Sequence, residues 1–358
     1  MRLLVDARPI IDPARGGVGR VALALVDAYA KTFLDDQIVC VTTGTKRPEL
    51  PKTLADRKNV THLHLRIPNK LWSALSVLGV VSLTRETERR VGKIDAAFFP
   101  NLGFIGGVST GHSILLLHDL SFLIEPRWFT WKQRLWHRAL RADKLIRSFP
   151  RLLAVSETTK RDAVRLLNIP EGRIAVIPIG PTLVGARPAS PSGMTTDVHA
   201  DIPTGQGDAG VAPTRHVLAL GGTDPRKNIG TAKAAVDHLR KDASFKDIKL
   251  LIPEKRPTDE ELASLYQNAA AFLYPSWYEG YGLPLHEAAQ FGTPCVASTS
   301  GALPETAPQG TLFANPVKPH HWVEALRIAL TSPRPNPTTP DPSLWTEAAK
   351  ILRSTLIG

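Results

Sequence analysis

The chain has 358 residues, of which 43% are hydrophobic and 22% are charged, enough for two hydrophobic cores of ordinary size. Lys and Arg outnumber Asp and Glu by 44 to 33, a formal net charge of +11, so the surface favours anionic partners such as nucleic acid, anionic lipid or a phosphorylated ligand. The two cysteines, Cys40 and Cys295, lie inside apolar runs, which argues against a disulfide framework or a zinc site and is typical of a reducing cytoplasm.

Neither export nor a membrane span is expected. The sequence opens with a strand-like run, MRLLVDARPI, which lacks the apolar core of a signal peptide. The longest nearly apolar stretch, LWSALSVLGVVSL at 71–83, is too short to cross a bilayer. No nucleic-acid recognition module is evident either. We therefore expect a cytoplasmic protein that does not bind nucleic acid.

The first half of the chain has the pattern of a parallel α/β domain, which we place at 1–181. Helical patterns alternate with short apolar runs typical of buried strands. These runs are RLLVDA at 2–7, QIVCVTT at 37–43, AAFFP at 96–100, SILLLHD at 113–119, LLAVS at 152–156 and RIAVIPIG at 173–180.

Two groups of residues in this half follow predicted strands, where α/β sheets bind ligands. GGVGR places Gly16, Gly17, Gly19 and Arg20 directly before the predicted helix VALALVDAY at 21–29. This is a weak signal by itself, because the full dinucleotide fingerprint is absent. His118 ends the strand-like run SILLLHD; a lone histidine is more often structural than catalytic, but this location is favourable.

Residues 127–147, RWFTWKQRLWHRALRADKLIR, combine aromatic and aliphatic residues with seven Lys or Arg. On a helix, one side would carry Trp131, Leu135, Ala139 and Ile146. Such a basic amphipathic helix is suited to an anionic membrane surface and a lipid-linked acceptor. The alternative is an ordinary domain helix with its tryptophans in the core and its cations solvated.

The second half predicts another α/β domain, at 215–341, after a linker at 182–214 rich in Pro, Gly, Ser and Thr. Its strand-like runs are HVLALGG at 216–222, IKLLIP at 248–253, AAFLYPS at 270–276 and TPCVAST at 293–299. Helical patterns occupy 231–240, 259–269 and 283–291, and a last helix is expected within 342–358. Two such domains facing each other create a cleft at the carboxyl ends of their strands.

Two cations follow the first strand of this half. Arg226 and Lys227 lie beyond a glycine turn and before a helix expected near Ile229, an arrangement suited to neutralising a diphosphate. A solvated basic turn is the alternative on so basic a chain.

The stretch PSWYEGYGLPLHEAAQFGTP at 275–294 places Glu279 and Glu287 on either side of a glycine turn. Gly280 and Gly282 permit unusual backbone angles, and Pro284 suits a first helical turn. The exposed N–H groups of such a turn favour an anion, whereas carboxylates accept hydrogen bonds from hydroxyls, as on a sugar or ribose. The alternative is that both glutamates only decorate the turn and the helix.

With these pieces assembled, the chain resembles the retaining glycosyltransferases of family 4. The resemblance rests on GGVGR at 16–20, HDLSFLIEP at 118–126, AVSETTKRDAV at 154–164, PRKNI at 225–229, the block 274–298 and ALPE at 302–305. It implies the GT-B fold, with two doubly wound Rossmann-like domains facing across a cleft: an acceptor-side domain at 1–181 and a nucleotide-sugar-binding domain at 215–341. Many relatives carry an arginine where this chain has Gly222, and Arg226 is its expected substitute. The passage from 248–253 to 258–266 is shorter than usual in the family, so we expect a shortened second domain.

The resemblance also implies roles for individual residues. The residue matching Glu279 contacts the hydroxyls of the donor sugar, and the one matching Glu287 holds the ribose. The residue matching Lys227 neutralises the diphosphate, assisted by Arg226, and His118 lies beside the donor sugar. The remaining expected donor contacts are the glycines Gly17 and Gly19 and the backbone N–H groups of Tyr281, Gly282 and Leu283.

The resulting expectation is a hexosyltransferase that moves a hexose, with mannose suggested by the HDLSF and PRKN motifs, from a nucleotide sugar to a glycan or lipid-linked acceptor. Retention of the anomeric configuration is implied, in the synthesis of a cell-surface polysaccharide such as lipopolysaccharide, at the inner face of the cytoplasmic membrane. No cofactor or metal is expected, since the chain lacks a D-x-D pair. The alternatives are a non-catalytic subunit that binds a nucleotide sugar or a partner enzyme, and a nucleotide-sugar epimerase; a dehydrogenase is disfavoured by the glycine loops.

Overall fold

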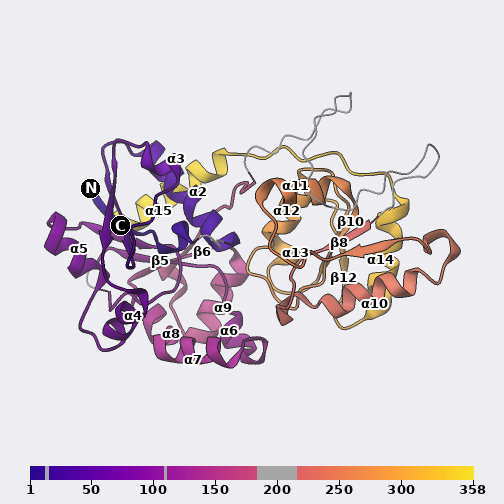
Figure 1. Ribbon diagram of the computed structural model, residues 1–358, viewed down its shortest axis with the longest axis horizontal. Helices are drawn as coiled ribbons and strands as arrows, with labels where there is room; N and C mark the ends of the chain where they lie inside the picture. Colours follow the sequence, from indigo (N-terminus) through magenta and orange to yellow (C-terminus); the bar gives the residue numbers. More distant parts are fainter. Residues whose placement is uncertain (13–15, 109–110, 184–215) are drawn as a thin grey trace.

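The computed structural model describes residues 1–12, 16–108, 111–183 and 216–358. They form two α/β halves that lie end to end, the first in indigo to magenta and the second mainly in orange (Figure 1). The predicted class, two doubly wound domains, is confirmed. The expected linker lies outside the described residues from residue 184 onward. Within the described ranges, no helix is long and apolar enough to span a bilayer.

The first half contains a parallel sheet of seven strands in the order β3-β2-β1-β4-β5-β6-β7. The strands are β1 (Arg2–Asp6), β2 (Gln37–Thr43), β3 (Val60–Leu65), β4 (Ala96–Phe99), β5 (Ser113–Leu117), β6 (Arg151–Ala154) and β7 (Ile174–Val176). Strand order reverses between β1 and β4, the switch point where such sheets bind ligands. Strand β3 was not among the predicted strands, because this edge strand, VTHLHL, is only partly buried and carries no continuous apolar run.

Alternate residues of β1 supply the cores on the two faces of this sheet, as the two-residue period of a strand requires. Leu3 and Val5 pack with Leu25 on one face, and Leu4 packs with Trp72 and Ile146 on the other. The helices of this half are α1 (Arg8–Ile11), α2 (Gly17–Thr32), α3 (Lys52–Ala55), α4 (Asn69–Val77), α5 (Leu83–Val91), α6 (Ser121–Ile124), α7 (Trp131–Leu140), α8 (Ala142–Ser148) and α9 (Glu157–Leu167), with 3-10 turns η1 (Pro126–Trp128) and η2 (Glu171–Arg173).

The glycines of GGVGR were expected before a helix starting at residue 21, and this expectation is wrong. Helix α2 begins at Gly17, so Gly17 and Gly19 both lie in its first turns. A Cβ added to Gly17 would lie 2.9 Å from Cδ1 of Leu283 in the second half. The glycine therefore allows the helix to begin in close contact with the other half.

The prediction of a single amphipathic helix over 127–147 is also wrong. The segment contains η1, α7 and α8, and the break between the two helices falls at Arg141, whose φ of 51° is left-handed. Leu140, Ala142 and Ile146 are all buried, and on one straight helix Leu140 would point away from the other two. The break turns all three toward the core, and it leaves Trp131 and Leu135 exposed on α7.

The second half contains a parallel sheet of five strands in the order β12-β11-β10-β8-β9. The strands are β8 (His216–Ala219), β9 (Lys249–Leu251), β10 (Ala269–Tyr274), β11 (Cys295–Ser298) and β12 (Leu312–Ala314). The helices are α10 (Ile229–Leu239), α11 (Asp259–Asn268), α12 (Leu283–Ala289), α13 (Leu303–Thr306) and α14 (Pro319–Thr331), with 3-10 turns η3 (Pro225–Lys227) and η4 (Ala243–Phe245). Strand β9 is the sheet edge, and residues 252–258 lead directly from it to α11, as the short passage in the sequence predicts.

The last helix, α15 (Ser343–Ile357), returns to the first half and packs against α2 (Figure 1). Trp345 contributes to the same core as Leu3 and Leu25, and its indole Nε1 donates to the Pro181 carbonyl at 2.9 Å. Arg353 pairs with Asp36 at 2.9 Å. Because α15 completes the core of the first half, the chain passes from one half to the other more than once.

Candidate active site

The glycine turn after β10 is pressed against the first half. A Cβ added to Gly280 would lie 1.7 Å from the backbone oxygen of His118, which leaves no room for a side chain. Gly282 has φ of 98°, and a Cβ there would lie 2.5 Å from Cδ2 of Leu303. The turn thus needs glycine for close approach at one position and for a left-handed backbone at the other.

Three backbone N–H groups of this turn, at Tyr281, Gly282 and Leu283, donate to no protein acceptor among the residues that the structure describes. The same three residues line a pocket of about 250 Å³ together with His118 and Glu279. Unpaired donors at the wall of a pocket are available to an anion or a hydroxyl.

Lys227 and Glu279 form the first ion pair of the site. The ammonium Nζ donates to Oε1 of Glu279 at 2.6 Å and to the Tyr274 hydroxyl at 3.0 Å. Burial raises the pKa of Tyr274, and the charge of Glu279 raises it further, so the phenol remains protonated. Gly221, at φ of 144°, allows the Lys227 side chain to pass: its added Cβ would lie 2.3 Å from the Lys227 Cβ.

Glu287 is buried on α12 at 1% exposure and forms the second ion pair, with Arg20 of α2. One oxygen accepts from Nη2 of Arg20 at 2.9 Å and from the Thr182 hydroxyl at 2.9 Å, and the other accepts from Tyr266 at 3.2 Å. Burial raises the pKa of the Glu287 carboxyl, against the charge of Arg20. Within the described residues, Arg20 Nε is buried without a hydrogen-bond partner.

Arg20 belongs to the GGVGR motif, but no role was predicted for its side chain. Its position four residues after Gly16, at the start of a helix facing the cleft, was the available signal. The sequence alone could not identify the partner of Arg20, because Arg20 and Glu287 belong to different halves of the protein.

Arg226 connects the halves at a second point. It pairs with Asp224 of its own turn at 2.8 Å and with Asp119 of the first half at 3.3 Å, and its guanidinium lies 5.3 Å from the centre of the Phe129 ring. Burial would lower the pKa of Arg226, but the hydrogen bonds that Arg226 donates to Asp224 and the charge of Asp119 raise it overall. The guanidinium is therefore permanently charged and fixed in place.

His118 lies at the end of β5 beside the glycine turn. Its Nε2 donates to the Pro100 carbonyl at 2.8 Å, so Nε2 carries the hydrogen and Nδ1 does not. Burial lowers the pKa of His118, against the hydrogen bond to Pro100 and the charge of Asp119. The ring is accordingly neutral near pH 7.

Most of the predicted residues surround one cleft. A pocket of about 830 Å³ is lined by Gly17, Arg226, Lys227 and Glu287, and it shares Gly17, Arg226 and Lys227 with the smaller pocket that contains His118, Glu279, Tyr281, Gly282 and Leu283. Gly19 is the exception, because it is buried in α2 and lines neither. The short loop at 253–257 forms another wall of the larger pocket.

The two halves are held together around this cleft by further contacts. Glu305 of α13 accepts from the backbone N–H groups of Glu157 and Thr158 at 2.7 and 2.8 Å, at the N-terminus of α9. The Tyr278 hydroxyl donates to Asp162 of the same helix. The cleft thus contains cations, carboxylates and free N–H groups in a fixed arrangement, which suits a ligand with both phosphates and hydroxyls.

Two family models match the chain. Residues 15–181 match the model described as Glycosyltransferase Family 4, and residues 252–350 match the model described as Glycosyl transferases group 1. Each match includes one wall of the cleft, with Arg20 and His118 in the first and Glu279 and Glu287 in the second.

Two curated relatives are similar at modest identity. The O-antigen chain mannosyltransferase B of Escherichia coli is 27% identical over 233 residues, which cover 57% of this chain and 57% of that protein. The MMP alpha-(1->4)-mannosyltransferase of Mycolicibacterium hassiacum is 28% identical over 240 residues, covering 58% of this chain and 52% of that protein. The matched parts thus span little more than half the length of these relatives.

Solved structures are similar in fold over the whole chain. A sucrose-phosphate synthase from Thermosynechococcus elongatus has a TM-score of 0.63 at 18% identity and covers 100% of this chain and 94% of its own. HepE from Anabaena, solved in complex with UDP and glucose, has a TM-score of 0.57 at 15% identity, with 99% and 95% coverage.

Proposed function

We propose, since the chain belongs to glycosyltransferase family 4, that it transfers a hexose from a nucleoside diphosphate sugar to a glycan or lipid-linked acceptor, with retention of the anomeric configuration. The observation that carries the proposal is the pairing of two carboxylates with two cations in one cleft, Glu279 with Lys227 and Glu287 with Arg20. Hydroxyls of a sugar and a ribose would replace the cations as donors to the carboxylates, and the released cations would face the diphosphate.

In the proposed reaction an acceptor hydroxyl attacks C1 of the donor sugar while the bond from C1 to the phosphate oxygen breaks. The proton of the hydroxyl passes to an oxygen of the departing nucleoside diphosphate. Negative charge grows on that leaving group, so Lys227 and Arg226 stabilise the transition state more than the ground state. Tyr281, Gly282 and Leu283 offer their N–H groups to the same oxygens. His118 is neutral and positions the sugar by hydrogen bonding.

Mannose is the hexose we propose, supported by the names of both curated relatives. Synthesis of a cell-surface polysaccharide is supported by the O-antigen chain in the name of the first relative, and the inner face of the cytoplasmic membrane stays part of the proposal. Metal independence stays a prediction, based on the absence of a D-x-D pair from the sequence.

The surface of α7 supports association with an anionic membrane. Trp131 is 64% exposed and Leu135 58%, and they lie one turn apart on a helix that also carries Lys132, Arg134 and Arg138. Exposed apolar side chains flanked by cations favour the interface of an anionic bilayer. In co-sedimentation with anionic vesicles at low salt we expect binding that Trp131→Ser with Leu135→Ser weakens; no binding by the unaltered protein would contradict the membrane proposal.

The donor proposal is tested by a thermal-shift screen of the purified protein against UDP-, GDP-, ADP- and dTDP-sugars with EDTA present. A ligand that binds only the folded protein raises its melting temperature. We expect one donor to do so, GDP-mannose if mannose is correct, and Glu287→Ala to abolish the shift. A shift that survives EDTA would support metal-free binding.

Turnover is then measured with that donor and a lipid or glycan acceptor. Transfer of the sugar with its anomeric configuration kept would support the whole proposal. Binding without turnover would instead favour the non-catalytic, sugar-nucleotide-binding subunit. No shift with any donor would contradict both.

A further inference from the structure

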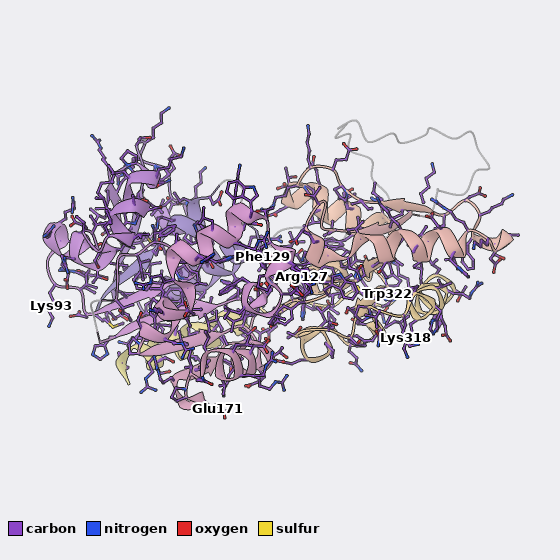
Figure 2. The ribbon with its side chains drawn as sticks, turned by 90° about the horizontal axis from the view of Figure 1, so that it is seen from below. Lys93, Arg127, Phe129, Glu171, Lys318 and Trp322 are labelled. Atoms are coloured by element: carbon purple, nitrogen blue, oxygen red, sulfur yellow. The ribbon has the colours of Figure 1, made fainter. Side chains whose placement is uncertain are left out.

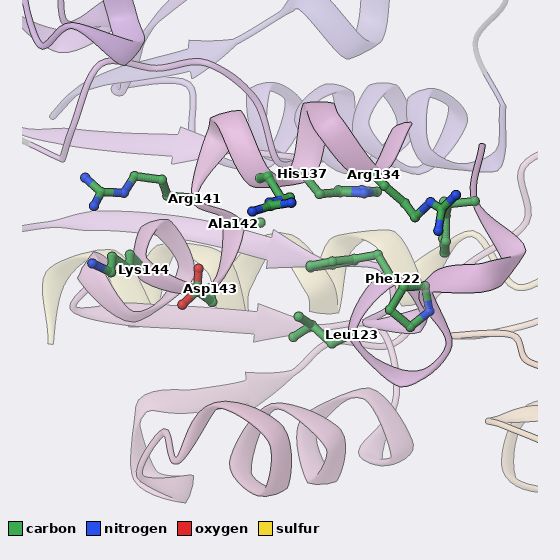
Figure 3. A pocket seen from close by; sticks show the side chains of 11 residues that line it. Phe122, Leu123, Arg134, His137, Arg141, Ala142, Asp143 and Lys144 are labelled. Carbon is green, nitrogen blue, oxygen red and sulfur yellow. The ribbon is translucent and has the colours of Figure 1, made fainter. Parts of the chain in front are cut away.

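A second concave site lies in the first half, beside the cleft. It is a pocket of about 480 Å³, within the size range of small-molecule sites. We call it the α7 pocket; α6, η1, α7 and α8 form it (Figure 3), and its apolar walls are Phe122, Leu123, Pro126 and Phe129. The ring of His137 is stacked on Phe122, with centres 4.6 Å apart.

Four cations line the same pocket: Arg134, Arg138, Arg141 and Lys144. Arg134 and Arg138 are four residues apart on α7, the spacing that places side chains on one side of a helix, and Arg141 lies at the break that ends this helix. Like charges at this spacing repel each other, so their clustering is not explained by the stability of α7. Asp143 is the one carboxylate among the lining residues.

These cations differ from those of the donor cleft in having no carboxylate partner within the described part of the chain. Lys227, Arg20 and Arg226 each form an ion pair, whereas Arg134, Arg138, Arg141 and Lys144 form none with the residues that the structure describes. Unpaired guanidinium groups are available to bind a phosphate, which they contact with two parallel hydrogen bonds.

The break between α7 and α8 lies at the pocket. Arg141, which lines the pocket, has φ of 51°, the left-handed conformation at which α7 ends and α8 begins. Every residue of α7 is exposed except His137 and Leu140. The helix is thus attached to the domain along a narrow line, with the pocket beside it.

Phe129 joins the α7 pocket to the donor cleft. Its ring lines both pockets and contacts Arg226, and it lies near the junction of the two halves (Figure 2). Its neighbours Trp128, Thr130 and Gln133 line the donor cleft. A molecule in the α7 pocket that extends past Phe129 would therefore enter the larger pocket of the donor cleft, which adjoins the smaller pocket of His118 and Glu279 where the sugar is proposed to lie.

We propose that the α7 pocket is the acceptor site and that it takes an acceptor in which a phosphate adjoins an apolar chain or a sugar ring. The phosphate binds the cations of α7 and α8, and the apolar or ring portion packs on Phe122 and Phe129. The identity of the bound molecule as an acceptor rests on the proposed function, but the predicted binding of the phosphate is measurable without the donor.

The test is calorimetric titration with geranyl phosphate and with mannose 1-phosphate, using geraniol and inorganic phosphate as comparison ligands. Arg134→Glu combined with Arg138→Glu should weaken binding of the organic phosphate by at least about tenfold, since hydrogen bonds to charged groups are strong. Arg147→Glu is the matched control, because Arg147 is exposed on the adjoining helix α8 but does not line the pocket; it should leave the affinity unchanged.

The two phosphates distinguish the sources of the acceptor. Tighter binding of geranyl phosphate supports a lipid-linked acceptor, and tighter binding of mannose 1-phosphate supports a phosphorylated glycan. Equal weakening by Arg147→Glu, or binding of neither phosphate, would overturn the proposal. Inorganic phosphate binding as tightly as either would remove the role of the apolar wall. The donor thermal shift of the double variant is measured in parallel: if it is preserved while the phosphate data fail, only this inference fails, and if no donor shifts even the unaltered protein, the proposed function fails instead.

Discussion

Arg20 and Glu287 meet across the cleft, with Nη2 of the arginine 2.9 Å from Oε1 of the glutamate. The glutamate is 1% exposed and the arginine side chain 13% exposed, so the pair is largely removed from water. One partner belongs to the first half of the chain and the other to the second, which makes the pair a link between them as well as part of the proposed donor site.

Removing Arg20 should destabilise the protein. Arg20→Ala leaves Glu287 buried with only the hydroxyls of Thr182 and Tyr266, and we expect a loss of about 3 kcal/mol in the free energy of unfolding. Glu287→Gln added to Arg20→Ala should recover part of it, because no buried charge then remains. Denaturant unfolding of both single variants and the double variant measures the coupling; additive costs would show that the pair contributes no interaction of its own.

The same carboxyl should give a pH dependence. Burial raises the pKa of Glu287 above its ordinary value of 4.5. The folded state then holds the proton more tightly, so the stability from Glu287 is present below pH 4.5 and is lost as pH rises through the folded pKa. Glu287→Gln should remove this loss, and the stability of the variant relative to the unaltered protein should therefore increase with pH. Unfolding curves from about pH 4 to about pH 7 test the sign; a difference that is constant with pH would contradict it.

Gly280→Ala should separate the two halves locally. The new Cβ would lie 1.7 Å from the His118 backbone oxygen, and a backbone atom cannot turn aside as a flexible side chain can. We expect loss of the donor thermal shift and a lower melting temperature. Gly230→Ala is the control, because Gly230 lies in α10 with nothing near its added Cβ, and alanine there should stabilise slightly. A normal donor shift in Gly280→Ala would show that the glycine contact is dispensable.

Lys227→Met should reduce turnover with the donor that the screen identifies. Loss of the ammonium removes charge stabilisation from the leaving diphosphate, an effect of about a hundredfold in kcat for comparable groups. Lys233→Met, an exposed position on α10, should leave kcat unchanged. Initial rates at saturating donor measure both; an unchanged kcat in Lys227→Met would remove the lysine from the proposed mechanism.

Local chemistry made much of the fold predictable. Strand β10, the glycine turn and α12 follow from an apolar run, two glycines and a proline within twenty residues, and all of these signals are local. Strand β12 and helix α14 were not among the predicted elements. Three-residue β12 is too short to show a period, and only its pairing with β11 defines it.

The sequence by itself determined the two parallel sheets, the glycine turn and the grouping of Glu279, Glu287 and Lys227 after strands, because periodicity, turn residues and strand ends are properties of short segments. Tertiary structure alone decided that Arg20 binds Glu287, that Arg141 breaks the helix after Leu140, and that four cations gather at a pocket beside Phe129. Each of these features depends on which distant surfaces come together. Burial of side chains at those surfaces selects the partner residue and the backbone angle, and no local sequence pattern encodes it.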